Sequence, residues 1–244
     1  MISVWGMTDR GIVRRENQDS CAYEVIGDGG LAWGVVCDGM GGAKAGDIAS
    51  QMAVATFRGH LEQLEDIEGP PPAAQLLLAA AEDANRVVYL KSETDDDCIG
   101  MGTTLVGLIL QDRQLCVVNV GDSRAYRISQ DAIRRITRDH SVVEDLVAKG
   151  DLTPEQARNH PQKNLITRAL GTSRKVKADL FQETLEEGDW VLLCSDGLIN
   201  EVTDQEIHQE VLAGGTPQEI CQRLVTRTLD SGAPDNVTVV LFQQ

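Results

Sequence analysis

The chain has 244 residues, of which 42% are hydrophobic and 25% charged. This composition is typical of one large globular domain and excludes a disordered or fibrous protein. The formal net charge of -16 argues against a nucleic-acid partner, because binding a phosphate backbone requires Lys and Arg to displace its counterions. The amino terminus lacks a leader pattern, and no run of about 18 apolar residues occurs. We therefore expect a cytoplasmic protein without a membrane segment.

Short apolar and β-branched runs open the chain and predict a meander of strands at 2–6, 20–26 and 31–37. Apolar positions at helical spacing then predict a helix from 46 to about 66. A second helix is expected after the break at Pro70-Pro71-Pro72, ending near Lys91. Two amphipathic helices thus follow the first strands.

The second half of the chain returns to strands. Runs at 103–110, 114–120, 125–128 and 132–137 have short links, which indicate antiparallel pairing. The polar stretch 140–163 contains helix starts at Ser141 and Thr153, so we expect a small, mobile helical flap there. Further capping patterns at Thr203 and Thr216 predict two helices, and a last strand is expected at 237–242. The order favours an α+β fold of two packed antiparallel sheets covered by helices, in a single domain spanning 1–244.

The informative local pattern is an apolar strand that runs directly into Asp-Gly. It occurs at Asp38-Gly39 and again at Asp196-Gly197. A strand holds the carboxylate rigidly, while glycine lets the backbone turn sharply and bring its carbonyl near the bound group. One Asp-Gly alone indicates an ordinary turn. Two copies with matching upstream strands favour a functional site.

Three more aspartates occupy strand edges in the same way: Asp19, Asp122 and Asp235. A set made only of carboxylate oxygens suits Mg²⁺ or Mn²⁺, whereas zinc sites use His or Cys, and the four histidines have no ligand spacing. Arg14 lies close to Asp19 in the chain, and a guanidinium can donate two hydrogen bonds to a phosphoryl group. Arginine and metal ions together would make a positive, phosphate-binding pocket in an acidic protein.

At this point the ordered motifs resemble the metal-dependent serine/threonine phosphatases of the PPM class, also called type 2C, over the whole chain and in minimal bacterial form. The motifs that carry the resemblance are Asp9-Arg10-Gly11, Arg14-Arg15-Glu16-Asn17-Gln18-Asp19, Cys37-Asp38-Gly39-Met40-Gly41-Gly42, Gly102-Thr103-Thr104, Asn119-Val120-Gly121-Asp122-Ser123-Arg124, Ser195-Asp196-Gly197-Leu198 and Asp235-Asn236-Val237-Thr238. Each motif is weak alone, but the ordered set is highly specific.

The resemblance implies a four-layer αββα sandwich with the metal ions in a cleft at one end of the sheets. It implies that Asp38 bridges two ions, that the Gly39 carbonyl binds one of them, and that Asp196 and Asp235 hold the other. Two further aspartates gain roles by the same resemblance: Asp19 acts through metal-bound water, and Asp122 binds a weaker third ion together with Asp196. Arg14 matches the phosphate-binding arginine, and 140–163 falls where the family has its flap.

The chemistry of the residues agrees with this resemblance. Two Mn²⁺ or Mg²⁺ ions lower the pKa of a bridging water, and the resulting hydroxide attacks phosphorus in line. We therefore expect a monomer that hydrolyses phosphoserine and phosphothreonine in proteins and opposes a Ser/Thr kinase. Cys37 and Cys194 lie inside strand runs, so we interpret them as buried structural thiols rather than nucleophiles.

The acid that protonates the leaving oxygen is not determined by the sequence. Animal relatives carry a histidine directly after the Asp-Gly, where this chain has Met40. His160 in the flap and a metal-bound water are both open, and we favour water, because flap histidines are more often surface residues.

Two other classes of function compete with a phosphatase. A catalytically silent relative would use the same fold for binding, but Asp38, Asp196, Asp235 and Arg14 are all present. A metal-dependent nuclease also gathers carboxylates around two ions. The acidic balance and the absence of a basic groove in the sequence count against it.

Overall fold

Two antiparallel sheets lie face to face at the centre of the molecule. In the computed structural model, which describes residues 1–41, 45–66 and 72–244, the first sheet has the strand order β1-β11-β10-β7-β8. The second has the order β2-β3-β5-β6-β9, with β4 paired to β3. The strands are β1 (Ser3–Asp9), β2 (Asp19–Ile26), β3 (Leu31–Met40), β4 (Gly102–Thr103), β5 (Leu105–Gln111), β6 (Gln114–Val120), β7 (Arg124–Ile128), β8 (Ile133–Arg135), β9 (Asp179–Thr184), β10 (Trp190–Cys194) and β11 (Val237–Gln243).

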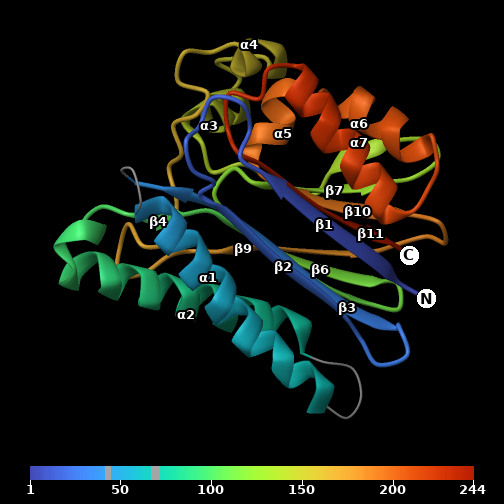
Figure 1. Ribbon diagram of the computed structural model, residues 1–244, viewed down its shortest axis with the longest axis horizontal. Coiled ribbons are helices and arrows are strands. Elements are labelled where there is room, and N and C mark those ends of the chain that lie inside the picture. Colours follow the sequence, from blue (N-terminus) through green and yellow to red (C-terminus); the bar gives the residue numbers. More distant parts are fainter. Residues whose placement is uncertain (42–44, 67–71) are drawn as a thin grey trace.

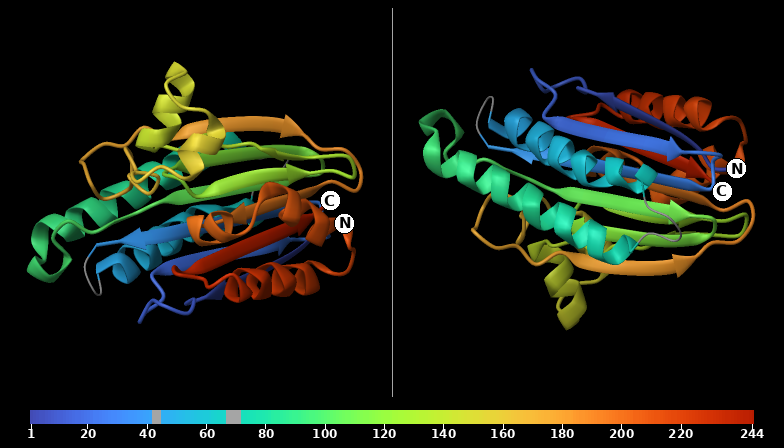
Figure 2. Two further views of the ribbon diagram at one scale, coloured as in Figure 1. Left: turned by 90° about the horizontal axis from the view of Figure 1, so that it is seen from above. Right: turned by 90° about the horizontal axis from the view of Figure 1, so that it is seen from below.

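Helices cover the outer face of each sheet, which completes four layers (Figures 1 and 2). The pair α1 and α2 packs on the second sheet, whereas α7 packs on β1 and β11 of the first. The helices are α1 (Ala45–Leu61), α2 (Ala73–Thr94), α3 (Val142–Lys149), α4 (Pro154–Arg158), α5 (Asp196–Glu201), α6 (Asp204–Leu212) and α7 (Pro217–Asp230). This arrangement confirms the predicted αββα sandwich.

Three apolar layers hold these four layers together. Phe57 and Leu77 belong to the core between the second sheet and its helices, and Leu224 belongs to the core under α7. Val36 and Phe242 belong to the third core, which lies between the sheets. The inner strands of both sheets are therefore buried on both faces, by the other sheet and by helices. This explains why β3 and β10 are almost wholly apolar.

Some elements differ from their predicted form. The first helix ends at Leu61 and continues as a 3₁₀ turn at Glu62–Asp66. The predicted strand 132–137 shortens to Ile133–Arg135, while β9 was not predicted at all. Gly42 of the Asp-Gly motif and Pro70-Pro71 of the predicted break lie outside the described residues.

The topology brings distant parts of the chain to one end of the sandwich. Asp19 lies directly opposite Asp38 in the β2–β3 pair, and β1 pairs with β11 over its whole length, from Ser3 opposite Gln243 to Asp9 opposite Val237. The start of β11 therefore lies beside the end of β1. No helix in the described part of the chain is long and apolar enough to span a bilayer.

Candidate metal centre

The five predicted aspartates belong to different elements and lie at the ends of strands or in the links beside them. Asp19 begins β2, Asp38 lies near the end of β3, and Asp196 follows β10 as the first residue of α5. Asp235 lies two residues before β11, the neighbour of β10, and Asp122 lies in the short link between β6 and β7.

Asp19 is held more firmly than a surface carboxylate. The hydroxyls of Ser195 and Thr238 each donate to its Oδ2 atom at 2.7 Å, while its Oδ1 atom is buried and has no hydrogen-bond partner. Burial raises the pKa of Asp19 to about 7, helped by the charges of Asp196 and Asp235 and opposed by the two hydroxyls. One oxygen is thus fixed by the protein, and the other is left for a cation.

The neighbouring carboxylates repel one another in the same way. Burial raises the pKa of Asp38 well above its usual value, and the charges of Asp19, Asp196, Asp122 and Asp235 raise it further. Burial, followed by the charge of Asp235, also raises the pKa of Asp196, and burial with the charge of Asp196 raises that of Asp122. All five groups therefore interact electrostatically, with Asp38 at the centre and Asp122 nearest in effect to Asp196.

The glycines of the two Asp-Gly pairs serve a different purpose from the sharp turn that the sequence suggested. Neither Gly39 nor Gly197 has a positive φ. A Cβ atom at Gly39 would lie 2.0 Å from the carbonyl oxygen of Gly46, and one at Gly197 would lie 1.9 Å from that of Asn236. Glycine is required at both places because a second backbone passes too close for any side chain.

Arg14 reaches the carboxylate cluster from an exposed loop. Its Nη2 atom donates to Oδ2 of Asp235 at 2.7 Å, and this hydrogen bond is the main cause that raises the pKa of Arg14. The charges of Asp38 and Asp196 act in the same direction, so the guanidinium faces the whole cluster. Its side chain is half exposed, at 53%, which leaves it accessible to a ligand from solvent.

Asn236 fixes the loop that carries Arg14. Its Nδ2 atom donates to the carbonyl oxygens of Arg10 at 2.8 Å and Glu16 at 3.0 Å, and its Oδ1 atom accepts from the backbone N–H of Gln18 at 2.9 Å. One buried amide therefore ties both ends of the loop to the residue that follows Asp235.

The donor set fits hard divalent cations. Asp19 Oδ1 and Asp196 Oδ1 are buried atoms without a hydrogen-bond partner, and a cation is the usual partner of such an oxygen. Within the ranges described, no three acidic, histidine or cysteine side chains form a complete metal-binding group as they stand. Arg14 donates to one oxygen of Asp235, and Asn200 donates to Oδ2 of Asp196 at 3.0 Å.

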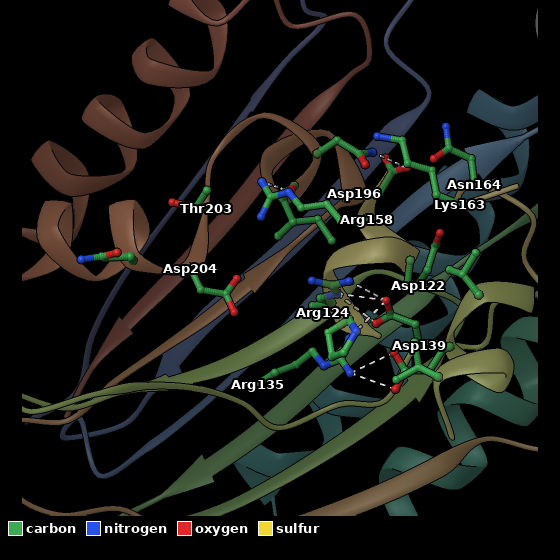
Figure 3. Close-up of a pocket in the computed structure, with 18 residues that line it drawn as sticks. Asp122, Arg124, Arg135, Asp139, Arg158, Lys163, Asn164, Asp196, Thr203 and Asp204 are labelled. Carbon is green, nitrogen blue, oxygen red and sulfur yellow. Dashed lines mark hydrogen bonds and ion pairs between the residues drawn. The ribbon is translucent and has the colours of Figure 1, made fainter. Parts of the chain in front are cut away.

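A cavity of about 570 Å³ opens beside the cluster and has both Asp122 and Asp196 in its wall (Figure 3). The flap contributes α3 and α4 to the same wall, through residues such as Val143 and Ala157. Arg124 forms its floor, bound to both oxygens of Asp139. The stretch 140–163 therefore forms part of the wall of the cavity that contains Asp122 and Asp196.

The histidines contact other groups. His160 lies on a separate hollow beside Leu152 and Pro161, and its Nδ1 atom accepts from the backbone N–H of Gln162 at 3.1 Å. His140 is buried and accepts from the N–H of Gly121, while burial lowers its pKa. No histidine of the described residues lines the cavity that contains Asp122 and Asp196.

The structure adds three residues to which sequence reasoning gave no role. Ser195, Thr238 and Asn236 all belong to the quoted motifs, next to predicted ligands. Their position beside the aspartates was a usable signal, but their partners lie far away in the chain: Asp19 is separated from Ser195 by 176 residues and from Thr238 by 219.

Comparison with known proteins gives consistent matches over the whole chain. The family described as Protein phosphatase 2C matches residues 13–226. The serine/threonine phosphatase stp of Listeria innocua is 37% identical over 238 residues, which cover 97% of this chain and 94% of that protein.

Solved structures give the same result. The serine/threonine phosphatase Stp1 from Staphylococcus aureus is 36% identical with a TM-score of 0.92, and the match covers 100% of this chain and 95% of that one. The catalytic domain of the phosphatase PstP, solved in complex with two manganese ions, is 36% identical with a TM-score of 0.85, covering 99% and 97% of the two chains.

Proposed function

The chain belongs to the protein phosphatase 2C family, and we propose that its aspartate cluster is the active site of a metal-dependent protein serine/threonine phosphatase. The observation that carries this proposal is the meeting of five mutually repelling carboxylates with Arg14 at one edge of the sandwich. Such a cluster is unfavourable without cations and becomes favourable with them.

We assign the ligands as the motifs imply. Asp38, the Gly39 carbonyl, Asp196 and Asp235 would hold two Mn²⁺ or Mg²⁺ ions, and Asp19, whose buried Oδ1 atom has no hydrogen-bond partner, would act on them through water. When bound, the ions supply positive charge that activates water and neutralises phosphoryl oxygens. The relative crystallised with two manganese ions supports the choice of metal. Asp122 and Asp196 line the same cavity, and the charge of Asp196 raises the pKa of Asp122. Asp122 would hold a third ion together with Asp196.

The protein groups then position the ester. Arg14, which contacts Asp235 in the structure, would donate two hydrogen bonds from its guanidinium fork to the phosphoryl group. The oxygen of a water forms the new bond to phosphorus, the bond to the seryl or threonyl oxygen breaks, and that oxygen takes a proton. Because His160 lies on another hollow, we assign this proton to a water in the cleft rather than to a side chain.

Substrates follow from the same chemistry. A phosphoserine or phosphothreonine in a protein is the product of a protein kinase, so the enzyme opposes a Ser/Thr kinase. All assigned residues come from one chain, which makes the monomer a sufficient catalytic unit. The six cysteines are all free thiols, which fits the reducing cytoplasm.

The test is hydrolysis of an aryl phosphate and of a phosphothreonine peptide with Mn²⁺, with a chelator, and with Asp196→Asn. We expect chelation to abolish activity and Asp196→Asn to lower kcat/KM about a hundredfold or more. Asp131→Asn, an exposed change in the β7–β8 turn, is the matched control and should leave activity unchanged. Activity that persists in chelator would overturn the assignment.

A further inference from the structure

A short basic segment stands out on the surface of this acidic protein. Arg174, Lys175 and Lys177 lie within four positions just before β9, and all three are exposed. Their side chains form no hydrogen bond or ion pair with any residue that the structure describes. In a chain with a net charge of -16, three adjacent cations without acidic partners are an exception that requires a reason.

The backbone of this basic segment is held in place. The side chain of Asn85, buried in α2, donates to the carbonyl oxygens of Ser173 at 3.1 Å and Arg174 at 3.4 Å, and it accepts from the N–H of Gly171 at 2.9 Å. Val176 packs against the core under α2. The three cations therefore project from a fixed backbone, which lowers the entropy cost of binding a partner.

A groove of about 580 Å³ is lined by α2 and by Arg174, Lys175 and Val176 of the basic segment. Tyr89 and the half-exposed Leu90 give it an apolar wall, and the loop leading into β9 runs close to α2 (Figure 2). Of its two acids, Asp83 is already paired with Arg86 and His60, so Glu82 alone opposes the cations. The groove thus combines positive charge on one side with apolar surface on the other.

The chain just before the basic segment is hydrogen-bonded to β4, which pairs with the strand of Asp38. Leu170, four residues before Arg174, exchanges backbone hydrogen bonds with Thr103 of β4. Thr103 in turn lies opposite Gly39 in the β3–β4 pair, and its hydroxyl donates to the carbonyl oxygen of Asp38 at 2.9 Å. The basic segment is thus joined through a few residues to the strands that carry Asp38, so one substrate could contact both the aspartate cluster and this groove.

We propose that the basic segment and the groove beside α2 bind an acidic segment of the phosphoprotein substrate, separated in sequence from the phosphorylated residue. Carboxylates of the substrate pair with Arg174, Lys175 and Lys177, and an apolar side chain lies over Tyr89 and Leu90. This inference rests on the proposed phosphatase activity and adds a substrate class to it.

The negative charge of the rest of the protein makes a preference for acidic peptides a clear sign of a local basic site. Without a local basic site, the net charge of -16 should repel an acidic peptide and slow its association relative to a neutral one. The substrates are phosphothreonine peptides that carry a block of glutamates about three to eight residues from the phosphothreonine, a reach of roughly 10–26 Å when extended. Their partners are identical peptides with glutamine in place of glutamate.

At low salt we expect the wild-type protein to prefer one or more glutamate peptides over their glutamine partners in kcat/KM, through a lower KM. The variant R174E/K175E should lose this preference, with a fall of about tenfold on the preferred peptide, and keep its activity on the glutamine peptides and on an aryl phosphate. Salt near physiological strength should shrink the difference, because the pairs are exposed.

The control variant is R58E/R113E, which changes the net charge equally. Arg58 lies in α1 and Arg113 in the β5–β6 turn; both are exposed, and among the described residues each forms an ion pair only with an exposed glutamate. Equal losses in the two variants would assign the effect to net charge and overturn the proposal, as would a wild-type protein that prefers no glutamate peptide at any spacing. Failure of the phosphatase itself would look different, since the aryl phosphate would then not be hydrolysed.

Discussion

Asn236 joins two parts of the active site that are more than 200 positions apart in the sequence. Its hydrogen bonds to Arg10 and Glu16 span 226 and 220 residues, and they hold the loop from which Arg14 reaches Asp235. The geometry makes Asn236 a positioning residue for Arg14.

Replacing Asn236 with alanine should therefore mimic the loss of Arg14. We expect Asn236→Ala to raise the KM for an aryl phosphate and to weaken inhibition by inorganic phosphate about tenfold, as Arg14→Ala does. In the double variant the effects should not multiply, because both changes remove the same interaction. Fully multiplicative effects, measured on protein that is still folded by circular dichroism, would show that Asn236 has only a structural role.

Single residues also show what sequence could and could not predict. Asp38 and Asp196 stood out because an apolar strand and a glycine lie beside them in the chain, so their signal is local. The purpose of Gly39 was misread, because the backbone that crowds it, at Gly46, is visible only after folding. Ser195 and Thr238 gained no role for the same reason, since their partner Asp19 is distant in sequence.

Among elements, α7 packs on β1 and β11 of the first sheet, and its stability depends on its N-terminal cap. The hydroxyl of Thr216 accepts from the N–H of Glu219, and the carboxylate of Glu219 accepts from the N–H of Thr216, with Pro217 in the first turn. We expect Thr216→Ala to lower the free energy of unfolding by about 1 kcal/mol, measured by urea denaturation, and Thr216→Ser to restore most of it. Activity of the folded protein should not change, and a loss of turnover without a loss of stability would contradict this view.

Elements with local signals were predicted well. The helix starts at Thr153, Thr203 and Thr216 all form the expected reciprocal caps, because every atom involved lies within four residues. Strand β9 was missed because it is an edge strand with the polar sequence DLFQET, and only its pairing with β6 makes it a strand. The fold class followed from the order of elements, whereas the pairing order of strands did not.

At the scale of the whole molecule, the repulsion between the aspartates of the metal centre lowers the free energy of unfolding of the metal-free protein. Unfolded Asp19 loses its proton near 3.8, whereas the folded protein keeps it up to about 7. Between these values the folded state binds more protons, so the free energy of unfolding of metal-free protein falls as pH rises. The raised pKa values of Asp38, Asp122 and Asp196 act in the same direction.

We therefore expect chelated protein to have a higher Tm at about pH 6.5 than at about pH 8, and excess Mn²⁺ to remove this slope, because cations compete with protons for the same oxygens. The window avoids His140, whose lowered pKa costs stability only as pH falls below its usual value of 6.5. Asp38→Asn should raise the Tm of metal-free protein while removing activity. A lower Tm for this variant in chelator would show that the carboxylates do not repel one another.

The pairing of β1 with β11 has a consequence for the life of the polypeptide. Because Asp235 lies two residues before β11, a nascent chain that lacks this stretch has neither the neighbour of β1 nor one of the proposed metal ligands. Ribosome-bound or prematurely terminated fragments would thus be unable to dephosphorylate anything. The chain would become active only after β11 has been translated, so unfinished copies would have no phosphatase activity in the cell.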